Sequence, residues 1–166
     1  MNEGIIQIYY GEGHGKSTAA IGNAIRYASE GKSVIIIQFL KGKNENELAF
    51  LNRLEPEIKI FRFAKSDESF EELSEQEQQE EAMNLRNGFN YGKKVVTTAA
   101  CDMLILDEVL GVIDEKVVTP QEMQELFENK PDDMTLICTG RVLEDSIRPY
   151  VDEIYNIAPE KIRIDE

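Results

Sequence analysis

The sequence predicts an α/β protein in which a mostly parallel sheet lies between two layers of helices. Apolar, β-branched runs of strand length alternate with helical segments along the chain. The run Ser33–Leu40 is apolar at nearly every position, as is typical of a parallel strand that is covered on both faces. An earlier run leads into a glycine-rich loop and then a helix, an arrangement that presents backbone N–H groups to phosphate oxygens.

In the first half of the chain, a buried strand is predicted at Ile5–Tyr10, where the residues are continuously apolar or β-branched. The helix after the glycine-rich loop is expected at Lys16–Glu30, because small and apolar side chains recur on one face and Gly31 follows. A short helix at Glu45–Leu54 and a third strand at Ile58–Phe63 are expected to follow the second strand.

In the second half, apolar residues spaced by three and four predict a long amphipathic helix at Ser74–Thr98. Residues 67–81 contain eight acidic residues and no basic one, and we expect a solvent-exposed loop and helix start there. The remaining predicted elements are a strand at Met103–Leu106, a helix that begins after Thr119 with Pro120 in its first turn, a strand at Thr135–Thr139, a helix at Leu143–Tyr150 and a strand at Glu153–Ala158.

Length and composition indicate a soluble protein with one nucleotide-binding domain over residues 1–166. The net charge of −14 argues against a nucleic-acid partner, since phosphate backbones bind basic surfaces. The sequence contains neither a signal-peptide pattern nor an apolar run long enough to span a membrane. Cys101 and Cys138 lie in or beside apolar runs and are predicted to be buried thiols. These features favour a cytoplasmic location.

The glycine-rich loop predicts a P-loop NTPase-like site. Gly11, Gly13 and Gly15 would let the backbone approach phosphates closely, while Lys16 adds a positive charge and the Ser17 hydroxyl can bind Mg²⁺. The usual pattern, G-x-x-x-x-G-K-S/T, has four residues between its glycines, and this loop has three. A shorter loop is expected to hold the phosphates differently. The alternative is a glycine-rich turn that binds nothing.

Two further motifs are expected at the same edge of the sheet. Asp107 and Glu108 follow an apolar strand and resemble a Walker B element, whose carboxylates bind Mg²⁺ or orient a nucleophile. Arg141 follows a later strand and has a guanidinium that can bind phosphate oxygens, although an ordinary surface arginine fits the same pattern. Lys41, after the second strand, is another candidate for phosphate binding.

These motifs, in this order, resemble those of the ATP:corrinoid adenosyltransferases of the P-loop type. The matching segments are Gly11-Glu12-Gly13-His14-Gly15-Lys16-Ser17-Thr18 for the family's loop pattern G-x-G-K-G-K-S/T-T, Gln38-Phe39-Leu40-Lys41-Gly42 for Q-F-x-K-G, Leu106-Asp107-Glu108 for L-D-E, and Thr139-Gly140-Arg141 for T-G-R. The loop match includes the shortening by one residue. His14 stands where the family usually has lysine.

The resemblance implies a homodimeric enzyme that binds ATP, Mg²⁺ and a corrinoid. In that family the reduced corrinoid, Co(I), attacks C5′ of ATP and expels triphosphate. Residues 11–18 with Lys41 and Arg141 would then bind the nucleotide, and Ser17, Asp107 and Glu108 would hold Mg²⁺. Lys16 and Glu108 would be the catalytic residues.

Two other functions are compatible with the same motifs. One is a nucleoside kinase resembling the thymidine kinases. The other is an ATP-binding regulatory protein with a degenerate corrinoid site, which the absence of tryptophan and an acidic, histidine-free segment at Val142–Glu166 would favour. Phe61, Phe63 and Phe70 are the aromatic residues available after the third strand, and each is either a corrin contact or part of the core.

Overall fold

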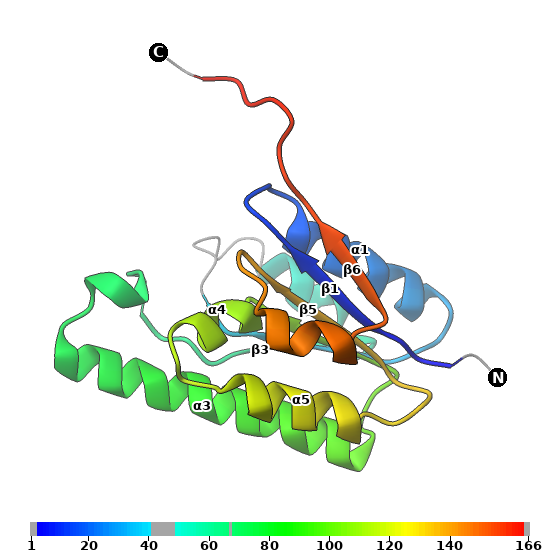
Figure 1. The fold of residues 1–166 in the computed structure, drawn as a ribbon. Helices are drawn as coiled ribbons and strands as arrows, with labels where there is room; N and C mark the ends of the chain where they lie inside the picture. The colour runs from blue at the N-terminus through cyan, green and yellow to red at the C-terminus, as the bar shows by residue number, and fades with distance from the viewer. Residues whose placement is uncertain (1–2, 41–48, 67, 165–166) are drawn as a thin grey trace.

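The computed structural model describes residues 3–40, 49–66 and 68–164. Its centre is a six-stranded sheet in the order β3-β2-β4-β5-β1-β6, in which all neighbouring strands are parallel (Figure 1). The strands are β1 (Ile6–Tyr10), β2 (Val34–Gln38), β3 (Ile58–Arg62), β4 (Met103–Asp107), β5 (Thr135–Gly140) and β6 (Glu153–Asn156). The predicted α/β fold with a parallel sheet is confirmed.

Helices cover both faces of this sheet (Figure 1). On one face, Ala20 and Ala24 of α1 (Lys16–Ser29) pack in a core cluster with strand residues such as Ile36. On the other face, a larger cluster joins the sheet to α3 (Glu75–Thr98), α4 (Val109–Asp114) and α5 (Pro120–Asn129). Short 3₁₀ turns lie at η1 (Asn52–Leu54), η2 (Phe70–Glu72) and η3 (Asp145–Tyr150).

Two helices, α3 and α5, begin at residues whose side chains cap them. The Ser74 hydroxyl accepts the Glu77 N–H at the start of α3, at 3.2 Å. At α5, Thr119 and Glu122 form a capping box, with Pro120 in the first turn. Both helix starts were predicted from the sequence and are confirmed.

Three elements differ from expectation, and a fourth is described only in part. A short helix, α4, directly follows β4 and was not predicted. The helix expected at Leu143–Tyr150 is a 3₁₀ turn at η3, which contains Pro149, a residue without an N–H to donate. The final strand ends at Asn156 rather than at Ala158. Of the helix expected at Glu45–Leu54, residues 45–48 lie outside the described residues, while residues 49–54 are helical and end in η1.

Within residues 68–81, which the structure describes, every acidic side chain except Glu81 is solvent-exposed. Glu81 retains only 7% of its surface exposed, so the prediction of a fully solvated run was wrong at this position. Cys101 and Cys138 are buried free thiols, as predicted. In the described residues no helix has the length and apolar character that crossing a membrane requires.

Candidate nucleotide-binding and catalytic site

The glycine-rich loop joins β1 to α1 at the carboxyl edge of the sheet. Gly11 and Gly15 have φ angles of 126° and 106°, a region that side-chain-bearing residues rarely adopt. Gly15 is also the N-cap of α1 and has no side chain to cap the helix. The first-turn N–H groups of α1 are therefore available to an anion at the loop.

The loop also packs against the segment that follows β6. The Gly13 N–H donates to the Ile157 carbonyl at 2.8 Å, and the Ile157 N–H donates to the Tyr10 carbonyl at 2.7 Å. A Cβ atom at Gly13 would lie 2.7 Å from the Ile157 carbonyl oxygen, too close for ordinary contact. Gly13 is therefore required for internal packing, a role that the phosphate-binding pattern did not predict.

The Lys16 ammonium lies inside the loop. Its Nζ donates to the Gly11 carbonyl at 2.7 Å and to the Gly13 carbonyl at 2.8 Å. These bonds hold a positive charge at the N-terminus of α1, where the helix dipole also attracts anions. The loop and helix start together form a local positive region on a strongly acidic protein.

Hydroxyl groups from two elements, α1 and β5, bind the Asp107 carboxylate at the end of β4. The Ser17 hydroxyl of α1 donates to Asp107 Oδ1 at 2.7 Å, and the Thr139 hydroxyl of β5 donates to the same oxygen at 2.8 Å. Thr139 Oγ1 also accepts the Glu108 N–H at 2.9 Å. Thr139 thus bonds to both acidic residues, and Asp107 in turn binds the P-loop serine; this part of Thr139 in the site was not predicted.

Burial sets the electrostatics of the two carboxylates. It raises the pKa of Asp107, although the hydrogen bonds from Ser17 and Thr139 act in the opposite direction. Burial and the neighbouring Asp107 charge raise the pKa of Glu108, and the Lys16 and Arg141 charges oppose this. The positive charge near the two carboxylates is therefore too small to offset their loss of hydration. A divalent cation would supply the missing positive charge.

The donor set fits Mg²⁺. Hydroxyl and carboxylate oxygens are the ligands that this ion prefers, and it commonly binds through one or two carboxylates together with substrate phosphates. Within residues 3–40, 49–66 and 68–164, no three or more His, Cys, Asp or Glu side chains group closely enough to form a dedicated metal centre. Ser17, Asp107 and Glu108 would thus hold Mg²⁺ jointly with a nucleotide.

The other side chains predicted to bind the nucleotide lie at the protein surface or outside the described residues. The Arg141 guanidinium pairs with the Glu12 carboxylate at 3.1 Å, and both side chains are largely exposed. His14 and Thr18 are also exposed. Lys41 lies outside the described residues. The structure therefore brings Lys16, Ser17, Asp107 and Glu108 together and leaves the remaining loop side chains at the surface.

A cavity of about 500 Å³ opens beside the loop. Arg141 lines it together with Leu40 after β2, Ala64 and Ser66 after β3, and Phe70 of η2. Phe61 and Phe63 instead pack on Tyr91 of α3, with ring centroids 4.9 and 6.0 Å apart, and so belong to the core. Of the three aromatic residues considered after the third strand, Phe70 is the one that lines this cavity.

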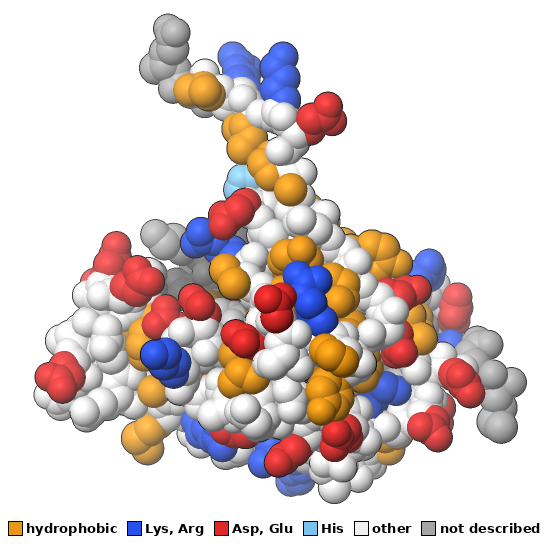
Figure 2. Space-filling model, in the orientation of Figure 1, with side chains coloured by type: hydrophobic (Ala, Val, Ile, Leu, Met, Phe, Trp, Pro, Cys, Tyr) orange, Lys and Arg blue, Asp and Glu red, His pale blue; other side chains and the backbone are white. Residues whose placement is uncertain are grey.

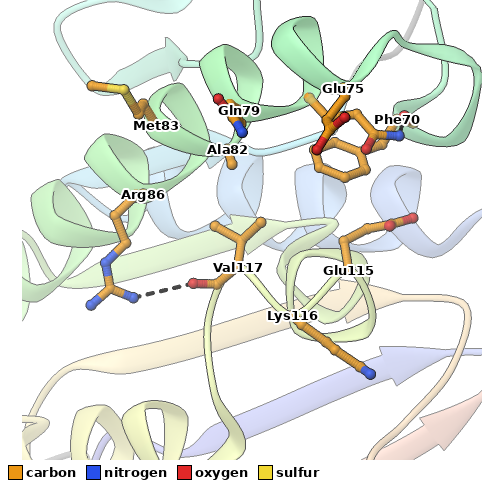
Figure 3. Close-up of a pocket in the computed structure, with 10 residues that line it drawn as sticks. Phe70, Glu75, Gln79, Ala82, Met83, Arg86, Glu115, Lys116 and Val117 are labelled. Carbon is orange, nitrogen blue, oxygen red and sulfur yellow. Dashed lines mark hydrogen bonds between the residues drawn. The ribbon is translucent and has the colours of Figure 1, made fainter.

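A second hollow of about 460 Å³ lies next to the first one and is open to solvent (Figure 3). Phe70 and Glu115 line both hollows, so these two residues form a partition between them. The outer hollow is bounded by α3 and by the chain that follows α4, where Arg86 donates to the Val117 carbonyl at 3.3 Å.

The fold and the loop define a P-loop nucleotide-binding protein of the α/β class. Solved structures share this fold, including a KaiC-like protein from Pyrococcus horikoshii OT3 with a TM-score of 0.61 and 17% identity, covering 99% of this chain and 77% of that chain. Flagellar accessory protein FlaH from Methanocaldococcus jannaschii gives a TM-score of 0.62 at 18% identity, covering 94% of this chain and 72% of that chain. At such identities the likeness concerns the fold alone.

Sequence comparisons define the family. The model of the ATP:corrinoid adenosyltransferase BtuR/CobO/CobP family matches residues 2–166. The corrinoid adenosyltransferase of Escherichia coli (strain K12) is 28% identical over 162 residues, which cover 98% of this chain and 80% of the relative. Corrinoid adenosyltransferase CobA of Salmonella typhimurium is 29% identical with the same coverage. The chain belongs to the ATP:corrinoid adenosyltransferase family.

Proposed function

We propose that the protein transfers the 5′-deoxyadenosyl group of ATP to the Co(I) centre of a corrinoid. The cobalt electron pair forms the Co–C5′ bond, the C5′–O5′ bond breaks, and its electron pair leaves with inorganic triphosphate. The observation that carries this proposal is the shortened loop in a member of this family, with Lys16 held inside it and Ser17 bonded to Asp107. Such a site binds and neutralises a triphosphate, and the reaction needs no protein nucleophile or general base.

Each predicted site residue has a role in this scheme. Lys16 and the N–H groups at the start of α1 bind the triphosphate and stabilise the negative charge that develops as it leaves. The exposed Arg141 exchanges Glu12 for a phosphate oxygen when nucleotide is bound. Lys41 contributes a further positive charge. The remaining residues of the segment 11–18, including His14 and Thr18, surround the nucleotide.

Mg²⁺ is held by Ser17 and by the carboxylates of Asp107 and Glu108. When bound, the ion neutralises charge on the triphosphate. The donation from Ser17 Oγ to Asp107 Oδ1 and the burial of both acids support this assignment. Thr139 keeps Asp107 in place through its hydroxyl donation.

Asp107→Asn and Glu108→Gln are each expected to raise the Mg²⁺ concentration for half-maximal activity about tenfold or more, because a ligand charge is lost. Without Mg²⁺, Asp107→Asn is expected to unfold at or above the wild-type temperature, since its amide oxygen still accepts from Ser17 and Thr139 and no buried charge remains. Magnesium titrations and thermal unfolding measure the two effects. Asp133→Asn, at an exposed site, is the control. If the magnesium titrations of Asp107→Asn and Glu108→Gln superimposed on that of the wild type, these residues would not be Mg²⁺ ligands.

The corrinoid binds in the cavity of about 500 Å³ beside the loop. Support comes from its position: Arg141 lines the cavity and pairs with Glu12 of the loop, so the cavity adjoins the nucleotide site. Phe70 and Leu40 supply apolar surface for the corrin ring. The cavity lies at the carboxyl edge of the sheet, where ligands of such folds bind.

The products distinguish this function from its alternatives. With Mg²⁺, ATP and a chemically reduced corrinoid, we expect inorganic triphosphate and a light-sensitive alkylcobalt product in equal amounts. Phosphorus NMR and absorption spectroscopy detect them, and a reaction without reductant is the control. ADP formed only after addition of a nucleoside would identify a kinase, and tight ATP binding without either product would identify a regulatory protein.

The protein acts as a single-domain homodimer in the cytoplasm and binds neither nucleic acid nor membranes. The net charge of −14 supports this, as does the face in Figure 2, where Lys and Arg side chains are interspersed with Asp and Glu and the body shows no continuous basic patch. The homodimer is inferred from membership of the family.

A further inference from the structure

Glu81 is a buried carboxylate among acidic residues that are otherwise exposed from residue 68 onward, and it is one of the residues that line the cavity beside the loop. We propose that Glu81 is a positioning residue for the corrinoid: it fixes the chain segment after β3 that forms one wall of the corrinoid site. This inference rests on the proposed function. It adds a residue that none of the recognised motifs contains.

The carboxylate of Glu81 binds two consecutive backbone amides. The Lys65 N–H donates to Oε1 at 2.9 Å, and the Ser66 N–H donates to Oε2 at 2.7 Å. Asn84, one turn further along α3, donates to Oε1 at the longer distance of 3.5 Å. Both carboxylate oxygens are therefore used, and hydrogen bonds to an ionised acceptor are stronger than neutral ones.

A second bond from α3 holds the same wall further along the chain. Gln78 donates from Nε2 to the Phe70 carbonyl at 2.9 Å. Between the two attachments, Ser66 Oγ accepts the Glu68 N–H at 3.2 Å. The N-terminal half of α3 thus binds the backbone at residues 65, 66 and 70. Figure 3 shows the Phe70 ring between the side chains of Glu75 and Glu115.

Burial of a charged carboxylate costs free energy, because the charge loses its hydration. At Glu81 the two shorter compensating bonds come from the connecting segment after β3, and that segment supplies Ala64, Ser66 and Phe70 to the cavity. The hydrogen bonds of Lys16 and Ser17 involve the loop and β4 instead. Loss of the Glu81 carboxylate should therefore affect corrinoid binding and leave ATP binding unchanged.

Glu81→Gln tests the role with little change of shape. The amide can accept only one of the two N–H groups and presents its own NH₂ to the other. We expect the KM for the corrinoid to rise about tenfold, the loss typical for a charge-assisted hydrogen bond, with the KM for ATP within about twofold of wild type. Glu80→Gln removes the same charge from the adjacent, exposed position and should leave both constants unchanged.

Amide hydrogen exchange on the full chain supplies a readout that does not depend on activity. In Glu81→Gln, peptides covering residues 63–72 should exchange faster, and peptides covering residues 5–18 should not. Equal corrinoid KM values for Glu81→Gln and Glu80→Gln, or a fall in kcat and a rise in both KM values together with a lower Tm, would overturn the positioning role. A wild-type protein that transfers no adenosyl group would contradict the proposed function itself, and this role with it.

Discussion

Lys16→Ala is expected to slow adenosyl transfer about 30- to 150-fold, equivalent to 2–3 kcal/mol of transition-state stabilisation. The reason is the loss of a charge-assisted contact with the triphosphate at the moment when negative charge develops on it. Stability should fall much less, by about 1 kcal/mol, because the hydrogen bonds to the Gly11 and Gly13 carbonyls lie in a partly exposed loop.

The measurement is the initial rate with saturating Mg·ATP and reduced corrinoid, together with thermal unfolding of the same protein. Lys94→Ala, at an exposed position of α3, is the matched control for removal of a lysine. A folded Lys16→Ala protein with a near-normal rate would show that the P-loop has no part in the chemistry.

Phe89→Ala is expected to destabilise the protein by about 3–5 kcal/mol. Phe89 lies on α3, is fully buried and belongs to the larger core cluster, so truncation leaves a cavity that its neighbours fill only in part. Urea denaturation measures the change in the free energy of unfolding. Asn90→Ala, at the exposed neighbouring position, should change stability by less than about 0.5 kcal/mol. A loss below about 1 kcal/mol for Phe89→Ala would contradict the packing described for α3.

The sheet and the long helices could be predicted because their signals are local. A continuous apolar run such as Ser33–Leu40 indicates a strand buried on both faces. Thr119 followed by Pro120 indicates where one helix begins, and apolar spacing indicates the other at Ser74. The short helix α4 could not be predicted, because it follows β4 directly and is entered through Glu108 in a left-handed conformation. Its apolar residues continue the pattern of the strand and show no separate helical period.

Only those residues of the site that belong to sequence motifs could be predicted. Ser17 and Asp107 were expected to share one metal site, and the structure places their oxygens 2.7 Å apart. Thr139 was noticed as the first residue of the T-G-R motif, but its hydrogen bonds to Asp107 and to the Glu108 amide were not predicted. Glu81 had no such signal, because within a run of acidic residues nothing in the sequence marks the one that is buried. Its hydrogen bonds to residues 65 and 66 depend on how α3 lies against the loop after β3.

During synthesis, the glycine-rich loop between β1 and α1 leaves the ribosome long before the segment that packs against it. The Ile6 amide donates to the Asp152 carboxylate, 146 residues further along the chain. The Gly13 amide likewise donates to the carbonyl of a residue made late, Ile157. At ordinary rates of translation this interval is on the order of 10 s. Until then β1 lacks both of its sheet neighbours, β5 and β6, and the loop lacks the carbonyl that fixes Gly13. A nascent chain arrested before residue 153 would therefore carry the complete glycine and lysine motif without a finished nucleotide site.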